Sequence, residues 1–404
     1  MVSAFHRLSL IGLLANGLVL GMLGGVLQLG LIGTLLSLVP WGLGDPLFQA
    51  ALWLIHFSDY LLAVLAAFPW ADVWVMQPGV MLWMGWYLGL GTMLMGIKVV
   101  EFRLGVMWRR VFGRKIEMPS LRKSSAVLFL IILLCSSSFS GQNGLEIAIL
   151  DVGQGDAALI TTPEKHAILI DTGPASAQYD AGERVIIPYL LEKGIKKLDA
   201  LLITHEDTDH IGGAKSILGN ISVGWIGVPD VGSRLESEEW SEGVPYELRP
   251  DGSLITLKKG DRIEMGSGAW MEVIGPVNCL EGTRSDSNNN SLVLNLYYEG
   301  QSMMLTGDME EEEMEDIQAE GQELNVTFFK EPHHGSRFSL LPTWMDQLEP
   351  KGVFISVGRN SFGHPDPTVL DYWEQRGVEV YRTDQAGTII LRMGRKGTEI
   401  ITGR

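Results

Sequence analysis

The chain has 404 residues, with 31 Lys and Arg against 48 Asp and Glu and a formal net charge of −17 at pH 7. This length exceeds that of an ordinary single domain, so two or more structural units are expected. The acidic balance argues against general binding of nucleic acid, which usually rests on Lys and Arg, and two cysteines exclude a disulfide-based scaffold.

The charge is unevenly distributed along the chain. Residues 1–140 hold nine Lys and Arg and five Asp and Glu, whereas residues 141–404 hold 22 and 43. The first part is also much more apolar than the second. This contrast predicts a membrane region followed by an acidic, water-exposed domain.

Four apolar stretches occupy the first part. A membrane-spanning helix needs roughly 20 mostly apolar residues, and Leu47–Phe68 and Gly79–Val100 meet that requirement. Leu8–Val39 is too long for one simple span and too short for two, and its glycines favour one tilted or broken helix. Ala126–Phe139 lies near the lower limit of length. These stretches predict several membrane crossings.

A basic loop separates the third and fourth stretches. Lys98–Lys123 carries eight Lys and Arg, and an excess of such residues marks a cytoplasmic loop. We therefore expect a multi-helix membrane region at 1–101, a basic cytoplasmic loop at 102–123 and a short transmembrane helix at 124–140. That last helix would place 141–404 on the extracytoplasmic face of the cell membrane. Contact of the loop with DNA or anionic lipid is the alternative.

Residues 141–404 alternate short β-rich runs with helical segments. The first expected strands each end in turn or polar residues. They are Leu145–Asp151, Ala157–Thr161, Ala167–Asp171 and Leu201–Thr204. Later strands are expected at Trp270–Ile274, Leu292–Tyr298, Ser302–Thr306, Val326–Phe329, Val353–Val357, Val378–Tyr381 and Thr388–Leu391. Amphipathic helices fit between them, and two mixed sheets packed between helices would bury so many strands in one domain.

One of these helical segments begins with an acidic run, Glu310–Glu313. Negative charge near the start of a helix is favoured by the helix dipole. We therefore expect the run to form a solvated face rather than a metal site.

The strongest chemical signal is Thr204–Gly213, which reads THEDTDHIGG. It follows an apolar strand directly, and Ile211 is expected to begin a helix. Four potential metal ligands fall within six residues of this connection, where side chains can converge on one point. They are His205, Asp207, Asp209 and His210. The segment predicts a metal site.

The same segment resembles the His-x-His-x-Asp-His signature of the metallo-β-lactamase superfamily, with Asp207 at the second His position. Three further segments stand in the order of the superfamily's other motifs: Leu169–Gly173, Met304–Asp308 and Pro332–Ser336. The resemblance implies an α/β fold, a metallo-β-lactamase-like αββα sandwich, which here follows an α-helical transmembrane region. It also implies two divalent metal ions.

The resemblance assigns roles to individual residues. It gives His205 and Asp207 to the first metal, Asp209 and His210 to the second, and makes Asp308 the bridge between them. His333 and His334 belong to a later His motif and are expected metal ligands. His364 is either a last ligand or a group that protonates the leaving oxygen. Asp209, Asp308 and His364 are the expected catalytic residues. Supporting or substrate-binding roles fall to Asp151, Gln154, Asp156, Asp171, Asn288, Asn289 and Ser336.

Further sequence segments resemble those of one particular family within the superfamily. Ile149–Asp156, Asn288–Val293 and Gly363–Pro365, with the metal motifs, resemble the hydrolase domain of ComEC-type DNA-internalisation (competence) proteins. In that family Asp is the usual residue at the second ligand position. Residues 1–100 resemble the end of the family's membrane module, which usually has more helices and an additional soluble domain. The implied partners are DNA, the membrane, and other DNA-uptake components or a missing channel portion.

The expected ligand set is rich in carboxylate, which favours Mn²⁺, with Zn²⁺ or Mg²⁺ as alternatives. Two such ions would activate a water molecule for in-line attack on a phosphoryl group. No protein nucleophile is then needed. The glycine-rich turn Asp151–Asp156 lacks the lysine and helix start of a nucleotide-binding loop, so no nucleotide cofactor is expected.

Three functions remain open. The leading hypothesis is a membrane-anchored, metal-dependent phosphodiesterase or nuclease that degrades the DNA strand not imported during uptake. Lys330, Arg337 and Arg359 would then offset the acidic charge near the metals. The second is a metallo-hydrolase of a small or lipid-head-group phosphodiester. The third is a DNA-transport component without catalysis.

Overall fold

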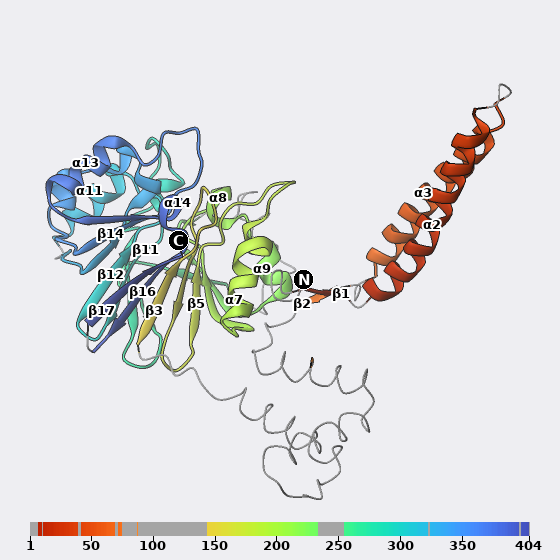
Figure 1. The fold of residues 1–404 in the computed structure, drawn as a ribbon. Helices are drawn as coiled ribbons and strands as arrows, with labels where there is room; N and C mark the ends of the chain where they lie inside the picture. Colours follow the sequence, from red (N-terminus) through yellow and green to blue (C-terminus); the bar gives the residue numbers. More distant parts are fainter. Residues whose placement is uncertain are drawn as a thin grey trace, which may run out of the picture. The chain divides into compact units, whose positions relative to one another are not determined.

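The structure is a computed structural model that describes residues 7–9, 11–38, 42–68, 72–74, 87, 144–232, 254–321, 324–395 and 397–403. The chain forms two compact units, Met1–Ser138 and Phe139–Arg404 (Figure 1). The third and fourth apolar stretches and the basic loop lie outside the described residues, apart from Tyr87.

The described part of the first unit is a helical hairpin. Helix α2 (Gly12–Leu36) packs against α3 (Asp45–Ala66), and the Ser58 hydroxyl donates a hydrogen bond to Met22 Sδ at 3.3 Å. A short antiparallel pair, β1 (Arg7–Ser9) and β2 (Asp72–Trp74), accompanies the helices. At the turn between the helices, a Cβ on Gly44 would lie 2.3 Å from the Gly33 carbonyl oxygen, so only glycine allows this approach.

Both helices are long and apolar enough to cross a membrane, judged by length and composition. Their large apolar side chains are exposed, as Leu27 and Trp53 illustrate. An amphipathic helix of a water-soluble core would bury such a face. The first apolar stretch, for which a tilted or broken helix was predicted, is one unbroken α-helix over Gly12–Leu36.

The second unit contains two sheets. The eight-stranded sheet has the order β17-β16-β3-β4-β5-β6-β7-β8, and β5 to β8 run parallel. Its strands are β17 (Gly397–Thr402), β16 (Ile389–Gly394), β3 (Leu145–Ile149), β4 (Ala158–Thr161), β5 (Ala167–Ile170), β6 (Lys197–Leu202), β7 (Ser222–Pro229) and β8 (Leu254–Leu257).

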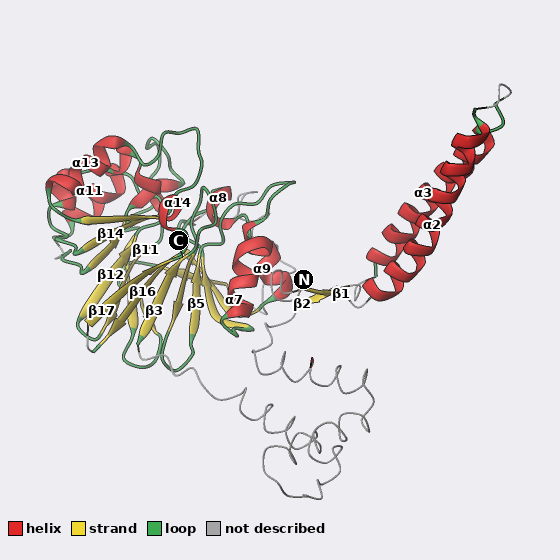
Figure 2. Cartoon of the chain, in the orientation of Figure 1, coloured by secondary structure: helices red, strands yellow, loops and turns green. Residues whose placement is uncertain are grey.

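The seven-stranded sheet has the order β15-β14-β13-β12-β11-β10-β9, and β12 to β15 run parallel. Its strands are β15 (Glu379–Arg382), β14 (Gly352–Ile355), β13 (Phe328–Lys330), β12 (Gln301–Leu305), β11 (Val293–Tyr298), β10 (Trp270–Gly275) and β9 (Arg262–Glu264). Figure 2 shows the two yellow sheets lying against each other with helices on the outer sides.

The helices divide between the two sheets. Those of the first half are the π-helix η1 (Gly182–Ile186), α7 (Ile187–Glu192), α8 (Thr208–Ile211) and α9 (Ala214–Asn220). Those of the second half are η4 (Asn288–Asn290), α11 (Glu311–Ala319), η5 (Pro332–Gly335), η6 (Arg337–Ser339), α12 (Pro342–Met345), α13 (Pro367–Gln375) and α14 (Thr383–Ala386).

Two apolar cores hold these layers together. The core between the sheets takes alternate residues of each strand, such as Ile147 and Ile149 of β3, because successive side chains point to opposite faces. The second core joins the seven-stranded sheet to α11, α12 and α13 through Phe329, Trp344 and Trp373. This arrangement of helix, sheet, sheet and helix confirms the predicted αββα sandwich.

Candidate metal centre

The centre lies where strands of both sheets end. Asp171 follows β5, the segment from His205 to His210 follows β6, and Asp308 follows β12. His333 and His334 follow β13. Because β5 is parallel to β6 and β12 is parallel to β13, each pair delivers its following loops to one edge. Ligand sites in sheets with parallel strands form at this carboxyl edge.

Helix α8 places the second pair of ligands from the HxDxDH segment. It begins at Thr208, so Asp209 and His210 lie on its first turn, and Asp207 is the extended residue that precedes it. The expectation that Ile211 begins the helix was therefore wrong. The amide N–H groups of His210 and Ile211 donate to the Asp207 carbonyl oxygen at 2.9 and 3.0 Å, which fixes the turn three residues earlier than the apolar pattern indicated.

The backbone is strained at three ligand-loop positions. Asp171, His333 and His334 have φ values of 58°, 45° and 56°, a region that residues other than glycine rarely adopt. Such conformations persist only where the surrounding structure holds them, and they concentrate at functional sites. Here they turn the chain sharply after β5 and β13, so that consecutive histidines face different partners.

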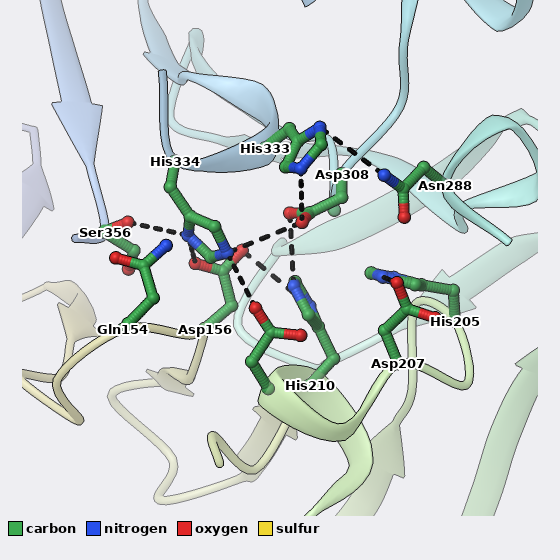
Figure 3. A network of polar contacts seen from close by, with 12 residues as sticks. Gln154, Asp156, His205, Asp207, His210, Asn288, Asp308, His333, His334 and Ser356 are labelled. Atoms are coloured by element: carbon green, nitrogen blue, oxygen red, sulfur yellow. Dashed lines mark hydrogen bonds and ion pairs between the residues drawn. The ribbon is translucent and has the colours of Figure 1, made fainter. Parts of the chain in front are cut away.

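The tightest group of potential ligands surrounds Asp308. Its Oδ1 lies 3.1 Å from His210 Nε2, and its Oδ2 lies 3.4 Å from His334 Nε2. His334 Nε2 is also 3.2 Å from Asp209 Oδ2. Within this group one potential ligand atom of each side chain lies within 4.8 Å of the others. Figure 3 shows His210, His334 and Asp308 pointing toward one another.

The first pair of expected ligands lies beside this group. His205 Nε2 is 3.7 Å from Asp207 Oδ2, and the rings of His205 and His210 have centroids 4.1 Å apart. Asp207 is held in turn by the Ser287 hydroxyl, which donates to Oδ1 at 2.7 Å. His205, Asp207 and the tight group thus form one continuous cluster (Figure 3).

The cluster has the features of a metal site. His205 Nε2 is fully buried and makes no hydrogen bond to any residue that the structure describes, so its lone pair is available to an ion. His334 Nδ1 lies 2.8 Å from the Ser356 carbonyl oxygen, which fixes a proton on that nitrogen and directs Nε2 toward Asp209 and Asp308. His210 Nδ1 is 2.9 Å from Asp171 Oδ2. Such outer contacts are typical of metal-binding histidines.

Thr204 and Ser291 contact the predicted ligands and Asp171 through their hydroxyl groups. The Thr204 hydroxyl donates to Asp171 Oδ2 at 2.8 Å and lies 3.0 Å from His205 Nδ1. Ser291 Oγ accepts the Asp308 amide N–H at 3.1 Å and lies 3.5 Å from His205 Nδ1. Neither residue was assigned a role from the sequence, although each lies within a segment that carries the family resemblance.

The carboxylates shape the electrostatics of the group. Burial lowers the pKa of His334, but Asp308, Asp209 and Asp156 outweigh it and raise that pKa to about 9. Burial likewise opposes the raised pKa of His210, which Asp308 and Asp171 cause. Burial would raise the pKa of Asp308, but the three neighbouring histidines hold it well below its usual value. This field attracts cations, and divalent ions would compete with protons for the imidazoles.

Lys330 was expected to offset the acidic charge where DNA binds, but the structure places it elsewhere. Its ammonium is buried and pairs with Asp156 Oδ2 at 2.5 Å, so it cannot reach DNA at the surface. Asp156 Oδ1 lies 3.6 Å from His334 Nδ1. A cavity of about 10 Å³ adjoins Lys330 and Asp156 beneath the cluster. Lys330 therefore neutralises an inner carboxylate instead of an incoming phosphate.

The expectation of a solvated acidic face at Glu310–Glu313 was wrong for two of its residues. Glu310 and Glu313 are buried. Glu310 pairs with Arg284, and its Oε1 lies 3.0 Å from His333 Nδ1. Burial raises the pKa of Glu313 well above its usual value. Sequence reasoning missed Glu310 as a site residue, although it stands only two positions after Asp308.

His333 and His364 lie at the outer side of the cluster. His333 Nε2 is 4.0 Å from Asp308 Oδ2, farther than the corresponding atom of His334. The His364 ring meets the His333 ring edge-on, with centroids 5.3 Å apart. Burial and the charges of His333 and His334 lower the pKa of His364 to about 4. In this state His364 is neutral at pH 7 and has no second ring proton to donate.

The remaining predicted site residues occupy supporting positions. Asn288 Nδ2 donates to Glu310 Oε1 at 3.2 Å, whereas Asn289 bonds Glu312 and the Glu313 amide and so holds the start of α11. Gln154 Oε1 accepts the Gly358 amide N–H. The Asp151 amide donates to the Thr388 hydroxyl, and the Ser336 hydroxyl accepts from the Phe338 amide and caps η6.

Comparison with known proteins accounts for this arrangement. Residues 150–359 match the family model described as the metallo-beta-lactamase superfamily. The chain belongs to that superfamily. Residues 1–99 match a second model, described as competence protein. Together with the relatives below, the two matches confirm the resemblance to ComEC-type proteins. The superfamily fold and the clustered ligands support a metal-dependent hydrolase that binds divalent ions.

Three relatives align with most of this chain. ComE operon protein 3 of Bacillus subtilis is 34% identical over 280 residues, 66% of this chain and 35% of that protein. Competence protein ComA of Neisseria gonorrhoeae is 28% identical over 64% of this chain and 34% of its own length. Recombination protein 2 of Haemophilus influenzae is 29% identical over 68% and 33%. The chain thus spans about a third of the length of these relatives.

Proposed function

We propose that this chain is a membrane-anchored, metal-dependent phosphodiesterase that cleaves DNA during its uptake into the cell. The observation that carries the proposal is the group of Asp209, His210, Asp308 and His334, with ligand atoms within 4.8 Å of one another. It occurs in a chain whose first 99 residues match the competence protein family. The DNA strand that is not imported is the proposed substrate.

The two halves of the ligand set suggest two metal positions. Asp209, His210 and His334 would hold one ion, His205 and Asp207 the other, and Asp308 would face both. Two divalent ions held there would supply Lewis-acid chemistry, namely activation of a water molecule and neutralisation of charge on a phosphoryl group. The carboxylate-rich set favours Mn²⁺ over Zn²⁺ or Mg²⁺.

The protein residues have separate tasks in this proposal. Asp171, Thr204 and Ser356 hold the imidazoles in orientation through the hydrogen bonds described above. His333 and His364 lie at the outer side, where they contact the substrate or serve as a further ligand. The neutral state of His364 favours these two roles over proton donation, since a general acid needs a pKa near the working pH.

The proposed organisation has four parts: a multi-helix membrane region at 1–101, a cytoplasmic loop at 102–123, a short transmembrane helix at 124–140 and the hydrolase domain at 141–404. The hydrolase would face outward, where incoming DNA arrives. Other uptake components, or a channel portion outside this chain, would then pass the second strand across the membrane.

The proposal is tested on the full chain purified in detergent. Labelled single-stranded DNA, duplex DNA and a small aryl phosphodiester are incubated with Mn²⁺, Zn²⁺, Mg²⁺ or a chelator. We expect DNA cleavage with Mn²⁺ and its loss with the chelator and in Asp308→Asn. Asp371→Asn, an exposed position on α13, serves as the matched control. Cleavage of the small ester alone would replace the DNA proposal with a small-substrate hydrolase.

A further inference from the structure

Two arginines meet one phenylalanine at the outer side of the metal centre. The guanidinium carbon of Arg284 lies 3.4 Å from the Phe338 ring centroid, and that of Arg337 lies 4.7 Å from it. Both arginines are exposed at the surface, and 40% of the Arg284 side chain is accessible. The cation–aromatic contacts restrain these long side chains, so less freedom remains to be lost when they bind an anion.

Phe362 projects from the neighbouring loop. Its side chain is 74% exposed, against 45% for Ile255 and 37% for Phe338, the other exposed large apolar residues in the described part of this unit. The loop is nevertheless ordered by Asn360, whose Oδ1 accepts the amide N–H groups of Phe362, Gly363 and His364 at 3.0–3.1 Å. The hydrogen-bonded turn at Asn360 therefore keeps the Phe362 side chain exposed to solvent.

The arginine–phenylalanine group and Phe362 are each connected to His333 through one intervening residue. Arg284 pairs with Glu310, which contacts His333 Nδ1 at 3.0 Å. On the other side, the Phe362 ring stacks on His364 with a centroid distance of 5.8 Å, and His364 contacts His333. Since His333 Nε2 is 4.0 Å from Asp308 Oδ2, both groups connect through His333 to the predicted metal ligands.

The local charge differs from that of the acidic domain. The Glu310 carboxylate is buried and already paired with Arg284, and the Glu313 side chain is buried as well. Asp366 lies near Arg337 and partly offsets its charge. Beside the ligands, the two guanidinium groups and the rings of Phe338 and Phe362 remain accessible, together with the carboxylates of Glu311 and Glu312 near Arg284. Guanidinium binds phosphate, and an exposed aromatic ring stacks on a nucleobase.

We propose that Phe362 and the group Arg284–Phe338–Arg337 bind unpaired nucleotides of the DNA strand that the site cleaves. A base stacks on Phe362, and the arginines hold backbone phosphates, so that the intervening phosphodiester lies over His333 and Asp308. A duplex keeps its bases stacked on each other and cannot offer one to Phe362. This inference rests on the proposed function and narrows its substrate to single-stranded DNA.

The test measures binding separately from cleavage. The full chain in detergent, loaded with Mn²⁺, is titrated against a short fluorescein-labelled oligonucleotide whose phosphorothioate linkages slow hydrolysis. Phe362→Ala should weaken binding about tenfold, the effect of losing one stacked base, whereas Phe362→Trp should restore it. An oligonucleotide without bases should bind the wild type and Phe362→Ala equally. Ile255→Ala, another exposed apolar position, is the matched control.

The arginines are tested through salt dependence. Arg337→Ala should weaken binding and reduce the slope of log affinity against log salt by about one, since one phosphate contact is lost. Arg395→Ala, whose side chain is 85% exposed and pairs with Glu299, should leave that slope unchanged.

Three results would overturn the inference: equal binding by Phe362→Ala and Ile255→Ala, equal affinity of the wild type for duplex and single strand, or no binding of the oligonucleotide. If the oligonucleotide binds as described but its unmodified form is not cleaved with any metal, the inference stands and the proposed phosphodiesterase fails. If DNA is cleaved but Phe362→Ala has no effect on binding, the phosphodiesterase stands and the inference fails.

Discussion

Asp308 faces a different imidazole with each of its carboxylate oxygens. Oδ1 lies near His210 and Oδ2 near His334, from loops that follow β6 and β13. Its backbone amide is fixed by the Ser291 hydroxyl, so the side chain has little freedom to reorient. A bridging role therefore depends on both oxygens and on the negative charge.

Asp308→Asn should remove most bound metal and reduce hydrolysis by at least about a hundredfold, because the amide offers one oxygen and no charge to the ions. Asp209→Asn should lose less metal, since Asp209 contacts only His334 among the ligands. Elemental analysis of the purified variants beside Asp371→Asn gives the metal content, and circular dichroism reports the fold. Full metal content in Asp308→Asn would contradict the two-metal assignment.

Lys330 and Asp156 form a buried ion pair beneath the ligands. Lys330→Met leaves the Asp156 carboxylate without its cation, which should cost about 3–5 kcal/mol of unfolding free energy. Replacing both partners, in Lys330→Met with Asp156→Leu, should recover a large part of that loss, because two apolar side chains leave no buried charge. Chemical denaturation of the wild type, Lys330→Met, Asp156→Leu and the double variant measures this. Equal stability of wild type and Lys330→Met would exclude the pair as a stabilising contact.

The sequence predicted some of the residues at the centre and missed the partners of others. The sequence indicated His205, Asp207, Asp209, His210, Asp308, His333 and His334 because their spacing and order form motifs. Lys330, Glu310 and Arg284 carry no such spacing. Their partners come from segments far away in the chain, as Asp156 does for Lys330, and only the packed fold brings those partners together.

At the scale of elements, β13 and α13 are joined by one buried hydrogen bond. Trp373 Nε1 donates to Glu331 Oε2 at 2.7 Å, just past the end of β13. Burial raises the pKa of Glu331 to about 8, although Trp373 and Lys330 oppose the change. The carboxyl group is therefore protonated at neutral pH and acts as a neutral acceptor between strand and helix.

This link should make stability depend on pH. The folded pKa of Glu331 lies above the ordinary value of 4.5, so its contribution is complete below about pH 4.5 and is lost as pH rises through about 8. Glu331→Gln keeps the acceptor for Trp373 without a titrating proton. The free energy of unfolding of the wild type should therefore fall relative to that of Glu331→Gln between pH 6 and pH 9. A difference that stays constant over this range would show that Glu331 is ionised in the fold.

Element prediction succeeded where apolar runs were compact. The strands expected at Leu145–Asp151 and Ala167–Asp171 correspond to β3 and β5. It missed the short strands β8 and β9. It also failed for β7 and β17, whose sequences SVGWIGVP and GTEIIT contain glycines or polar residues. Their strand form comes from pairing with β6 and β16 rather than from local preference.

At the scale of the whole molecule, the acidic charge lies after residue 140, where 22 Lys and Arg stand against 43 Asp and Glu, and the first part is slightly basic. In the described residues, much of the acidic charge at the centre is paired or buried, as Asp156 and Glu310 illustrate. The average charge of a domain therefore says little about one face of it. The fold class followed from the motifs, whereas the surface beside the metal centre required the structure.

The orientation in the membrane is a separate prediction. The eight basic residues of Lys98–Lys123 should remain in the cytoplasm, and one further crossing should place the hydrolase outside. A reporter that is active only outside the cytoplasm, fused after Ser140, should be active, and the same reporter fused within 102–123 should be silent. The reverse pattern would place the hydrolase in the cytoplasm and weaken its role in uptake.

Strand order also determines when the centre can form during synthesis. Strand β3 lies beside β16, although most of the domain's sequence separates the two strands. His205 and His210 are likewise synthesised more than a hundred residues before His334. A partial chain has half of the ligands and an open sheet edge, so it can hold no complete centre. A metal centre built from these residues would consequently form only after the segment that carries His334 has been synthesised.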